Sequence, residues 1–163
     1  LTIPFISALK IPFSELMLPA HLVILFATFV FIFLADKYAM SWFRGTIPIL
    51  DSKKIKFYHD IVFVGLFGMV FTGIFLAWPA KEFLFKTPLF IGKMFFVLGL
   101  VINGFVIGKF MNISTVRTFQ SLTNKEKISL FVSGGVSTVS WVGATVISLY
   151  LFGSVVETLR TLF

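Results

Sequence analysis

Four long runs of apolar residues alternate with shorter polar stretches along this chain. Residues 16–35 and 61–80 hold no Asp, Glu, Lys or Arg, residues 87–108 are interrupted only by Lys93, and residues 128–156 are again free of charge. Twenty apolar residues rise about 30 Å as a helix, which matches the hydrocarbon core of a bilayer. The pattern predicts four membrane-spanning helices, over about residues 16–38, 60–80, 87–109 and 127–152.

The first fifteen residues differ from these runs. They are apolar but contain Pro4 and Pro12, and they carry charge at Lys10 and Glu15. We expect residues 1–15 to form an interfacial segment that lies at the membrane surface rather than a span. The whole chain, residues 1–163, is then a single membrane domain.

The charged residues between the runs predict how the helices are oriented. The loops after the first and third runs hold nine Lys or Arg, among them Lys53 and Lys125, whereas the other side holds four. Because cytoplasmic loops are enriched in cations, we expect these two long loops in the cytoplasm and both termini outside. Short connections favour an antiparallel up-down bundle of four helices. A prokaryotic plasma membrane is the expected location.

Composition narrows the class of protein. Hydrophobic residues make up 58% and charged residues 13% of the chain, and the mean hydropathy is +1.00. These values indicate an all-α integral membrane protein, whose main partner is the lipid bilayer. The net charge of +7 comes from cations that flank the spans, so we expect no nucleic-acid partner. The absence of cysteine excludes disulfides and thiolate metal sites.

Two ionisable residues lie inside the predicted spans. His21 and Lys93 each lie about five residues into a helix, and the first and third helices of an up-down bundle are parallel, so both side chains are expected at one depth. A neutral imidazole near a lysine can be a heme or metal ligand, a proton relay or an anion-binding pair. The competing interpretation is that Lys93 snorkels to the outer interface and His21 bonds a neighbour such as Tyr150 or Ser148.

The second histidine, His59, lies at the opposite end of the spans, about 27 Å from His21 by helix rise. The two cannot ligate one iron. A transmembrane cytochrome with two bis-histidine hemes is excluded, because four histidines are needed and the chain has two. His59 can still take Met40 or Met111 as a partner at its own level. We interpret it as an interfacial residue beside Asp60, which is expected at a helix N-terminus.

Smaller polar residues predict helix ends and packing faces. Asn124 or Thr123 is expected to cap the fourth helix, with Glu126 in its first turn. Small residues recur at spacings of three or four in the spans, for example at Gly65, Gly68 and Thr72, and these faces are expected to pack closely. Asn103 and Trp141 lie mid-span and are expected to bridge helices.

Short motifs resemble a known group of membrane proteins. Residues 20–22 (AHL) open the first helix, residues 65–77 (GLFGMVFTGIFLA) form a Gly-rich second helix, residues 88–94 (PLFIGKM) open the third, and residues 137–141 lie in the fourth. Over roughly residues 18–150 the chain resembles the four-helix proteins grouped around copper-resistance protein CopD and the HemJ-type protoporphyrinogen oxidases. The resemblance implies that His21 ligates heme b and that Lys93 is functionally required.

Two hypotheses about function follow. In the first, the chain binds heme b near its outer face and has a redox or heme-handling role, with His21 as an axial iron ligand and Lys93 beside it. In the second, it is a non-catalytic structural subunit that packs against other membrane subunits or in a homo-oligomer. No nucleotide-binding or hydrolase motif is present, so these two classes of enzyme have no support in the sequence. Of the two hypotheses, only the first is compatible with an enzyme.

Overall fold

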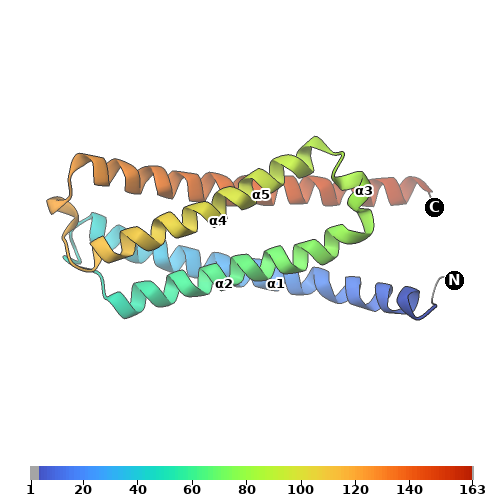
Figure 1. Ribbon diagram of the computed structural model, residues 1–163, viewed down its shortest axis with the longest axis horizontal. Helices are drawn as coiled ribbons and strands as arrows, with labels where there is room; N and C mark the ends of the chain where they lie inside the picture. Colours follow the sequence, from blue (N-terminus) through green and yellow to red (C-terminus); the bar gives the residue numbers. More distant parts are fainter. Residues whose placement is uncertain (1–3, 163) are drawn as a thin grey trace. The chain divides into compact units, whose positions relative to one another are not determined.

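A computed structural model describes the backbone of residues 4–162 and the side chains of residues 16–79 and 81–151. The described chain is helical and contains no strand. Its elements in order are α1 (Pro4–Phe43), α2 (Ser52–Ala77), the 3-10 turn η1 (Trp78–Ala80), α3 (Lys81–Leu84), α4 (Pro88–Ser114), the 3-10 turn η2 (Phe119–Ser121) and α5 (Asn124–Leu162) (Figure 1).

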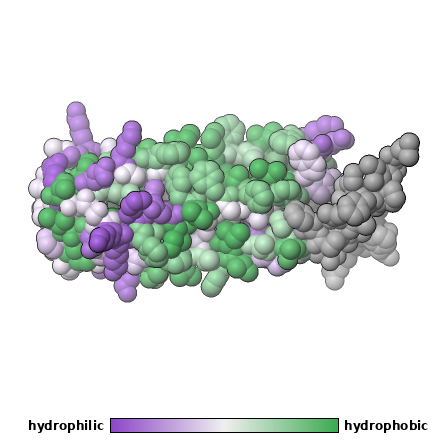
Figure 2. Space-filling view, turned by 60° about the horizontal axis from the view of Figure 1, so that its bottom comes forward, coloured by the Kyte–Doolittle hydropathy of each residue, from purple (hydrophilic) through white to green (hydrophobic). Residues whose placement is uncertain are grey.

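Four of these helices are long and apolar enough to cross a membrane, as the sequence predicted. Their candidate spans are Leu16–Phe43, Ser52–Ala77, Pro88–Ser114 and Asn124–Leu151. Large apolar side chains point outward along them; Phe26 is 74% exposed and Phe95 is 70% exposed. On the face in Figure 2, hydrophobic side chains cover most of the surface. Such a surface is stable in lipid and unfavourable in water, so the chain is a membrane-spanning protein.

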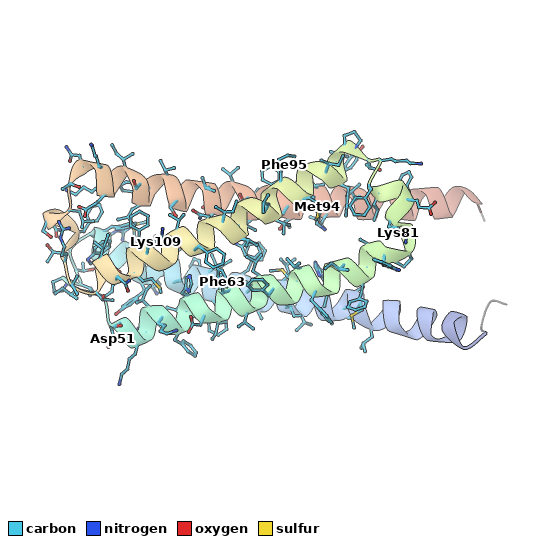
Figure 3. The ribbon with its side chains drawn as sticks, in the orientation of Figure 1. Asp51, Phe63, Lys81, Met94, Phe95 and Lys109 are labelled. Atoms are coloured by element: carbon cyan, nitrogen blue, oxygen red, sulfur yellow. The ribbon has the colours of Figure 1, made fainter. Side chains whose placement is uncertain are left out.

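The helices extend beyond the predicted spans at several ends. α2 begins at Ser52, with Asp51 as its N-cap, because the Asp51 carboxylate accepts a hydrogen bond from the Lys54 backbone N–H at 2.8 Å (Figure 3). The prediction that Asp60 marks this helix start is therefore wrong. Asp60 lies two turns inside α2 and pairs with Lys56 at 2.6 Å. Because the Asp51 cap starts α2 before the apolar run begins, the polar residues between them are part of the helix.

The start of α5 agrees with the sequence. Thr123 and Glu126 form a capping box, in which the Thr123 N–H donates to Glu126 Oε2 at 2.7 Å and the Glu126 N–H donates to Thr123 Oγ1 at 3.3 Å. Arg117 joins this arrangement through an ion pair with Glu126 at 2.9 Å. The turn between α4 and α5 is thereby tied to the first turn of α5.

The N-terminal segment is helical from Pro4, and α1 continues through Pro12 and Pro19 without a break. Proline is tolerated within helices of membrane proteins, because neighbouring groups satisfy the freed backbone carbonyl. The side chains of residues 1–15 lie outside the described part of the chain, so their predicted position at the membrane surface stays a prediction. Gly45, with φ of 73°, takes the left-handed conformation just after α1 ends.

The chain divides into two units, one ending at Lys81 and the other beginning at Glu82. In the first unit α1 packs on α2, which we call hairpin one. Ile24 lies against Gly68 and Thr28 lies against Gly65. Because the residue numbers rise along α1 while they fall along α2, the two helices are antiparallel. Thr28 is 2% exposed, and a Cβ at Gly65 would overlap its hydroxyl oxygen. The predicted packing role of Gly65 and Gly68 is confirmed.

In the second unit α4 packs on α5, which we call hairpin two. A Cβ at Gly143 would lie 2.7 Å from the Phe96 ring, and one at Gly99 would lie 3.2 Å from Ser140 Oγ, so these helices are antiparallel as well. Trp141 and Ser140 are buried. Both hairpins therefore rest on glycines that let a bulkier or polar side chain of the partner helix approach the backbone.

Candidate functional site

His21 lies in α1 with its imidazole facing α2. The ring is half-buried, and Gly73 of α2 lies beside it, since a Cβ there would be 3.7 Å from His21 Cε1. The same helix supplies the hydrogen-bond partner, because His21 Nδ1 is 2.7 Å from Thr72 Oγ1. The sequence had suggested Tyr150 or Ser148 as neighbours of His21, and the partner in hairpin one is instead Thr72.

The hydroxyl of Thr72 carries one proton, and its Oγ1 lies 2.8 Å from the Gly68 carbonyl oxygen and 3.3 Å from the Met69 carbonyl oxygen. The donor and the acceptor in the contact with His21 depend on the tautomer of the imidazole. We assign the ring proton to Nδ1, because Thr72 then keeps its bond to Gly68 while it accepts from His21. Thr72 is buried, at 5% exposed, which protects the arrangement from water.

An imidazole held in this way resembles the histidines that bind metals. In such sites one ring nitrogen donates to an oxygen of the protein, which fixes the tautomer and the ring orientation, and the other nitrogen binds the metal. Within the described residues, no group of three or more His, Cys, Asp or Glu side chains converges on one point. An iron porphyrin needs one or two protein ligands, and a single histidine such as His21 can supply one of them.

Lys93, the other predicted site residue, lies in the second turn of α4, in hairpin two. It is half-buried, and in the described part of the chain it makes no hydrogen bond or ion pair. A lysine inside a span is unfavourable unless it snorkels or finds a partner. Because His21 and Lys93 belong to different units, their proximity stays a prediction.

His59 lies at the other end of α2 from Thr72. Its ring stacks on Phe63, with centroids 5.3 Å apart, and its Nδ1 lies 3.7 Å from Asp60 Oδ1. Helix rise between residues 59 and 72 is about 20 Å, less than the separation expected from the sequence. That distance is still too long for His21 and His59 to share one iron.

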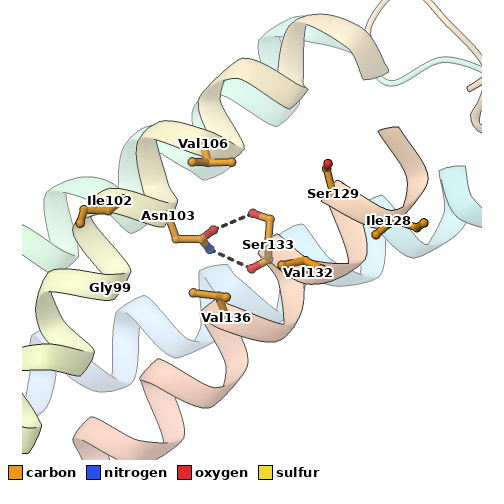
Figure 4. A pocket seen from close by; sticks show the side chains of 9 residues that line it. All are labelled: Gly99, Ile102, Asn103, Val106, Ile128, Ser129, Val132, Ser133 and Val136. Carbon is orange, nitrogen blue, oxygen red and sulfur yellow. Dashed lines mark hydrogen bonds between the residues drawn. The ribbon is translucent and has the colours of Figure 1, made fainter. Parts of the chain in front are cut away.

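A second polar cluster lies in hairpin two. The Asn103 side-chain N–H donates to the Ser133 carbonyl oxygen at 2.8 Å, and the Ser133 hydroxyl donates to Asn103 Oδ1 at 2.8 Å (Figure 4). Both residues are buried. The predicted bridging role of Asn103 is confirmed. Because its amide bonds both the hydroxyl and the backbone carbonyl of Ser133, we interpret this cluster as structural.

Thr72 is the site residue whose role sequence reasoning missed. It was assigned to a packing face, and only the register of hairpin one shows that it lies opposite His21. The sequence could have suggested this partner, because the second span has a hydroxyl residue at the level of His21 if its helix is antiparallel to the first. The interpretation of His21 rests on these contacts, for no family model, curated protein or solved structure matches the chain.

Proposed function

We propose that the chain is a heme-b-binding membrane protein with a redox or heme-handling role, and that His21 is an axial ligand of the iron. The observation that supports this proposal is the His21–Thr72 hydrogen bond, which engages Nδ1 and orients the ring, as the outer partners of metal-binding histidines do. Thr72 holds the ring in one orientation. Bound heme b would supply one-electron chemistry at its iron.

Absorption spectroscopy of the purified protein tests this proposal. We expect a Soret band in the wild-type protein, loss of that band in His21→Ala, and retention in the control variant His59→Ala. Circular dichroism checks that both variants keep their helices. A wild-type protein that stays colourless after expression with added heme precursor would contradict the proposal.

The proposal extends to the arrangement of the helices. An antiparallel up-down bundle of four helices brings α1 and α4 parallel and places Lys93 at the depth of His21, where its ammonium would pair with a heme propionate or a substrate carboxylate. Removing one partner of a buried pair costs about 3–5 kcal/mol. Lys93→Met is then expected to lose heme or shift its spectrum with the helical fold intact. Unaltered heme content and unaltered melting would show that Lys93 only snorkels.

Orientation belongs to the same proposal. We infer that both termini lie outside a prokaryotic plasma membrane and that the two cation-rich loops lie in the cytoplasm. Single cysteines at Lys53 and Lys125 are expected to resist an impermeant thiol reagent in intact cells and to react after lysis. Ready labelling in intact cells would reverse the orientation.

A second candidate function is favoured by a different observation. The large exposed phenylalanines, such as Phe26 and Phe95, together with polar groups that are paired inside each hairpin, suit a structural subunit that packs against other membrane subunits or a second copy. In that case His21 joins α1 to α2 and has no cofactor. A colourless protein that co-purifies with a larger complex would favour this function.

A further inference from the structure

A groove of about 450 Å³ lies between α4 and α5 near the end of hairpin two that carries the turn. Its lining is mostly apolar and includes Ile102, Val106, Val132 and Val136, with the Asn103–Ser133 pair between them (Figure 4). Val132 is 58% exposed and Val136 is 41% exposed. The groove lies within two candidate membrane spans.

Two lysines, Lys109 and Lys125, lie about one helical turn beyond the lining residues at the turn-side end of the groove. On α5, Lys125 precedes Ser129, Val132 and Val136 by four, seven and eleven residues, which places all four on one helical face. On α4, Lys109 follows Val106 by three residues and lies near the C-terminal end of the helix (Figure 3). On both helices, the apolar lining of the groove is therefore followed by a lysine on the side of the turn.

The register of the hairpin places the two lysines at similar levels. Counted from the Asn103–Ser133 contact, Lys109 lies about 9 Å along α4 and Lys125 lies about 12 Å along α5 in the same direction. Both are exposed, and neither makes a hydrogen bond or ion pair within the described residues. Lys127 differs, since its ammonium lies over the Phe119 ring, 5.4 Å from the centroid.

We propose that this groove binds one acyl chain of an anionic phospholipid, whose phosphate lies between Lys109 and Lys125. Charge complementarity supports this occupant, because juxtamembrane lysines attract anionic headgroups. Ser129, which lines the groove one turn beyond Lys125, offers a hydroxyl donor to the phosphate or ester oxygens. The apolar lining would contact the acyl chain toward the middle of the spans, and the two lysines would contact the anionic headgroup toward the turn.

Native mass spectrometry of the full chain in detergent tests the proposal. The probes are dioleoyl phosphatidylglycerol and dioleoyl phosphatidylcholine, which share their acyl chains and differ in headgroup charge. We expect a single high-affinity adduct with phosphatidylglycerol and weaker binding of phosphatidylcholine. Equal binding of the two lipids would overturn the proposal.

Variants separate the headgroup from the chain. Lys109→Gln and Lys125→Gln are each expected to weaken phosphatidylglycerol binding about fivefold, since one juxtamembrane lysine contributes on the order of 1 kcal/mol. The matched control is Lys53→Gln, which removes the same charge from hairpin one and should leave binding unchanged. Equal effects of all three substitutions would indicate nonspecific attraction and overturn the proposal.

The groove itself is tested by filling it. Val136→Trp is expected to abolish the adduct, whereas Val142→Trp, on an exposed part of α5 outside the groove lining, should keep it. Circular dichroism and elution volume confirm folding and assembly. A Val136→Trp protein that binds the lipid normally but changes its oligomeric mass would assign the groove to a second copy of the chain and overturn the lipid proposal.

Discussion

The two hairpins use different polar contacts to join their helices. In hairpin two, Asn103 and Ser133 exchange two hydrogen bonds and neither side chain can ionise. In hairpin one, the contact is between Thr72 and His21, whose ring has a second nitrogen and can bind a proton or a metal. The comparison indicates that joining helices does not require histidine. We therefore look for chemistry in hairpin one and for a structural role in the polar cluster of hairpin two.

Among the contacts that join helices within a hairpin, the largest expected effect on stability concerns the glycine contacts of hairpin one. A Cβ at Gly65 would overlap the Thr28 hydroxyl, whereas a Cβ at Gly134 of α5 meets no atom within 4 Å. We expect Gly65→Ala to lower the free energy of unfolding by about 1–3 kcal/mol through overpacking. Gly134→Ala is the control and should raise it slightly, because alanine favours the helix. Unfolding in SDS, followed by circular dichroism, measures both.

A double variant identifies the cause of this loss. Thr28→Ala removes the oxygen that the new methyl group would meet, so the double variant Gly65→Ala with Thr28→Ala should recover much of the lost stability. Simple addition of the two single effects would show that the Thr28 contact is not responsible.

The next effect concerns the orientation of His21. Thr72→Val keeps the shape of the side chain but removes the acceptor for His21 Nδ1–H, and loss of such an outer partner weakens metal binding about 10- to 100-fold. We expect heme affinity to fall by that factor in Thr72→Val and to survive in Thr72→Ser. Heme titration followed at the Soret band measures it. Equal affinities of all three proteins would favour the structural interpretation of His21.

A smaller effect is expected in hairpin two. Asn103→Leu removes both bonds to Ser133, and hydrogen bonds between helices in membranes contribute about 0.6–1.7 kcal/mol. We expect a loss of stability in that range for Asn103→Leu and a smaller loss for Ser133→Ala, which keeps the bond to the Ser133 carbonyl. Heme content should not change in either variant. A loss of heme in Asn103→Leu would mean that the two hairpins are not functionally distinct.

The smallest expected effects lie at the boundary of the membrane. Thr123→Ala removes a cap of α5 and should lower stability by about 1 kcal/mol. Lys56→Ala breaks an exposed ion pair with Asp60 in α2 and should cause no measurable change, because such pairs are solvated and screened by salt. The free energy of unfolding of each variant, measured at low and at high salt, tests both expectations. A larger loss for Lys56→Ala would indicate that the first turns of α2 contribute more to stability than their contacts suggest.

The sequence predicted the four spans because charge-free runs of that length have few alternatives to crossing a bilayer. It placed the start of α2 too late, since the polar residues from Ser52 to Asp60 were assigned to a loop, although Asp51 caps a helix that includes them. It did not predict Thr72 as the partner of His21. That pairing depends on the register of two antiparallel helices, which glycine contacts such as Gly65 with Thr28 determine and which hydropathy does not encode.

The hydrogen bonds inside each hairpin have a consequence for how the protein is made. During synthesis, 51 further residues are added after His21 before Thr72 is present, and 30 are added after Asn103 before Ser133 is present. At about 5–20 residues per second, the imidazole is without its acceptor for roughly 3–10 s and the amide for roughly 2–6 s. Each side chain receives its partner from the very next long helix. Insertion can thus proceed pair by pair, and neither group has to wait for the other half of the chain.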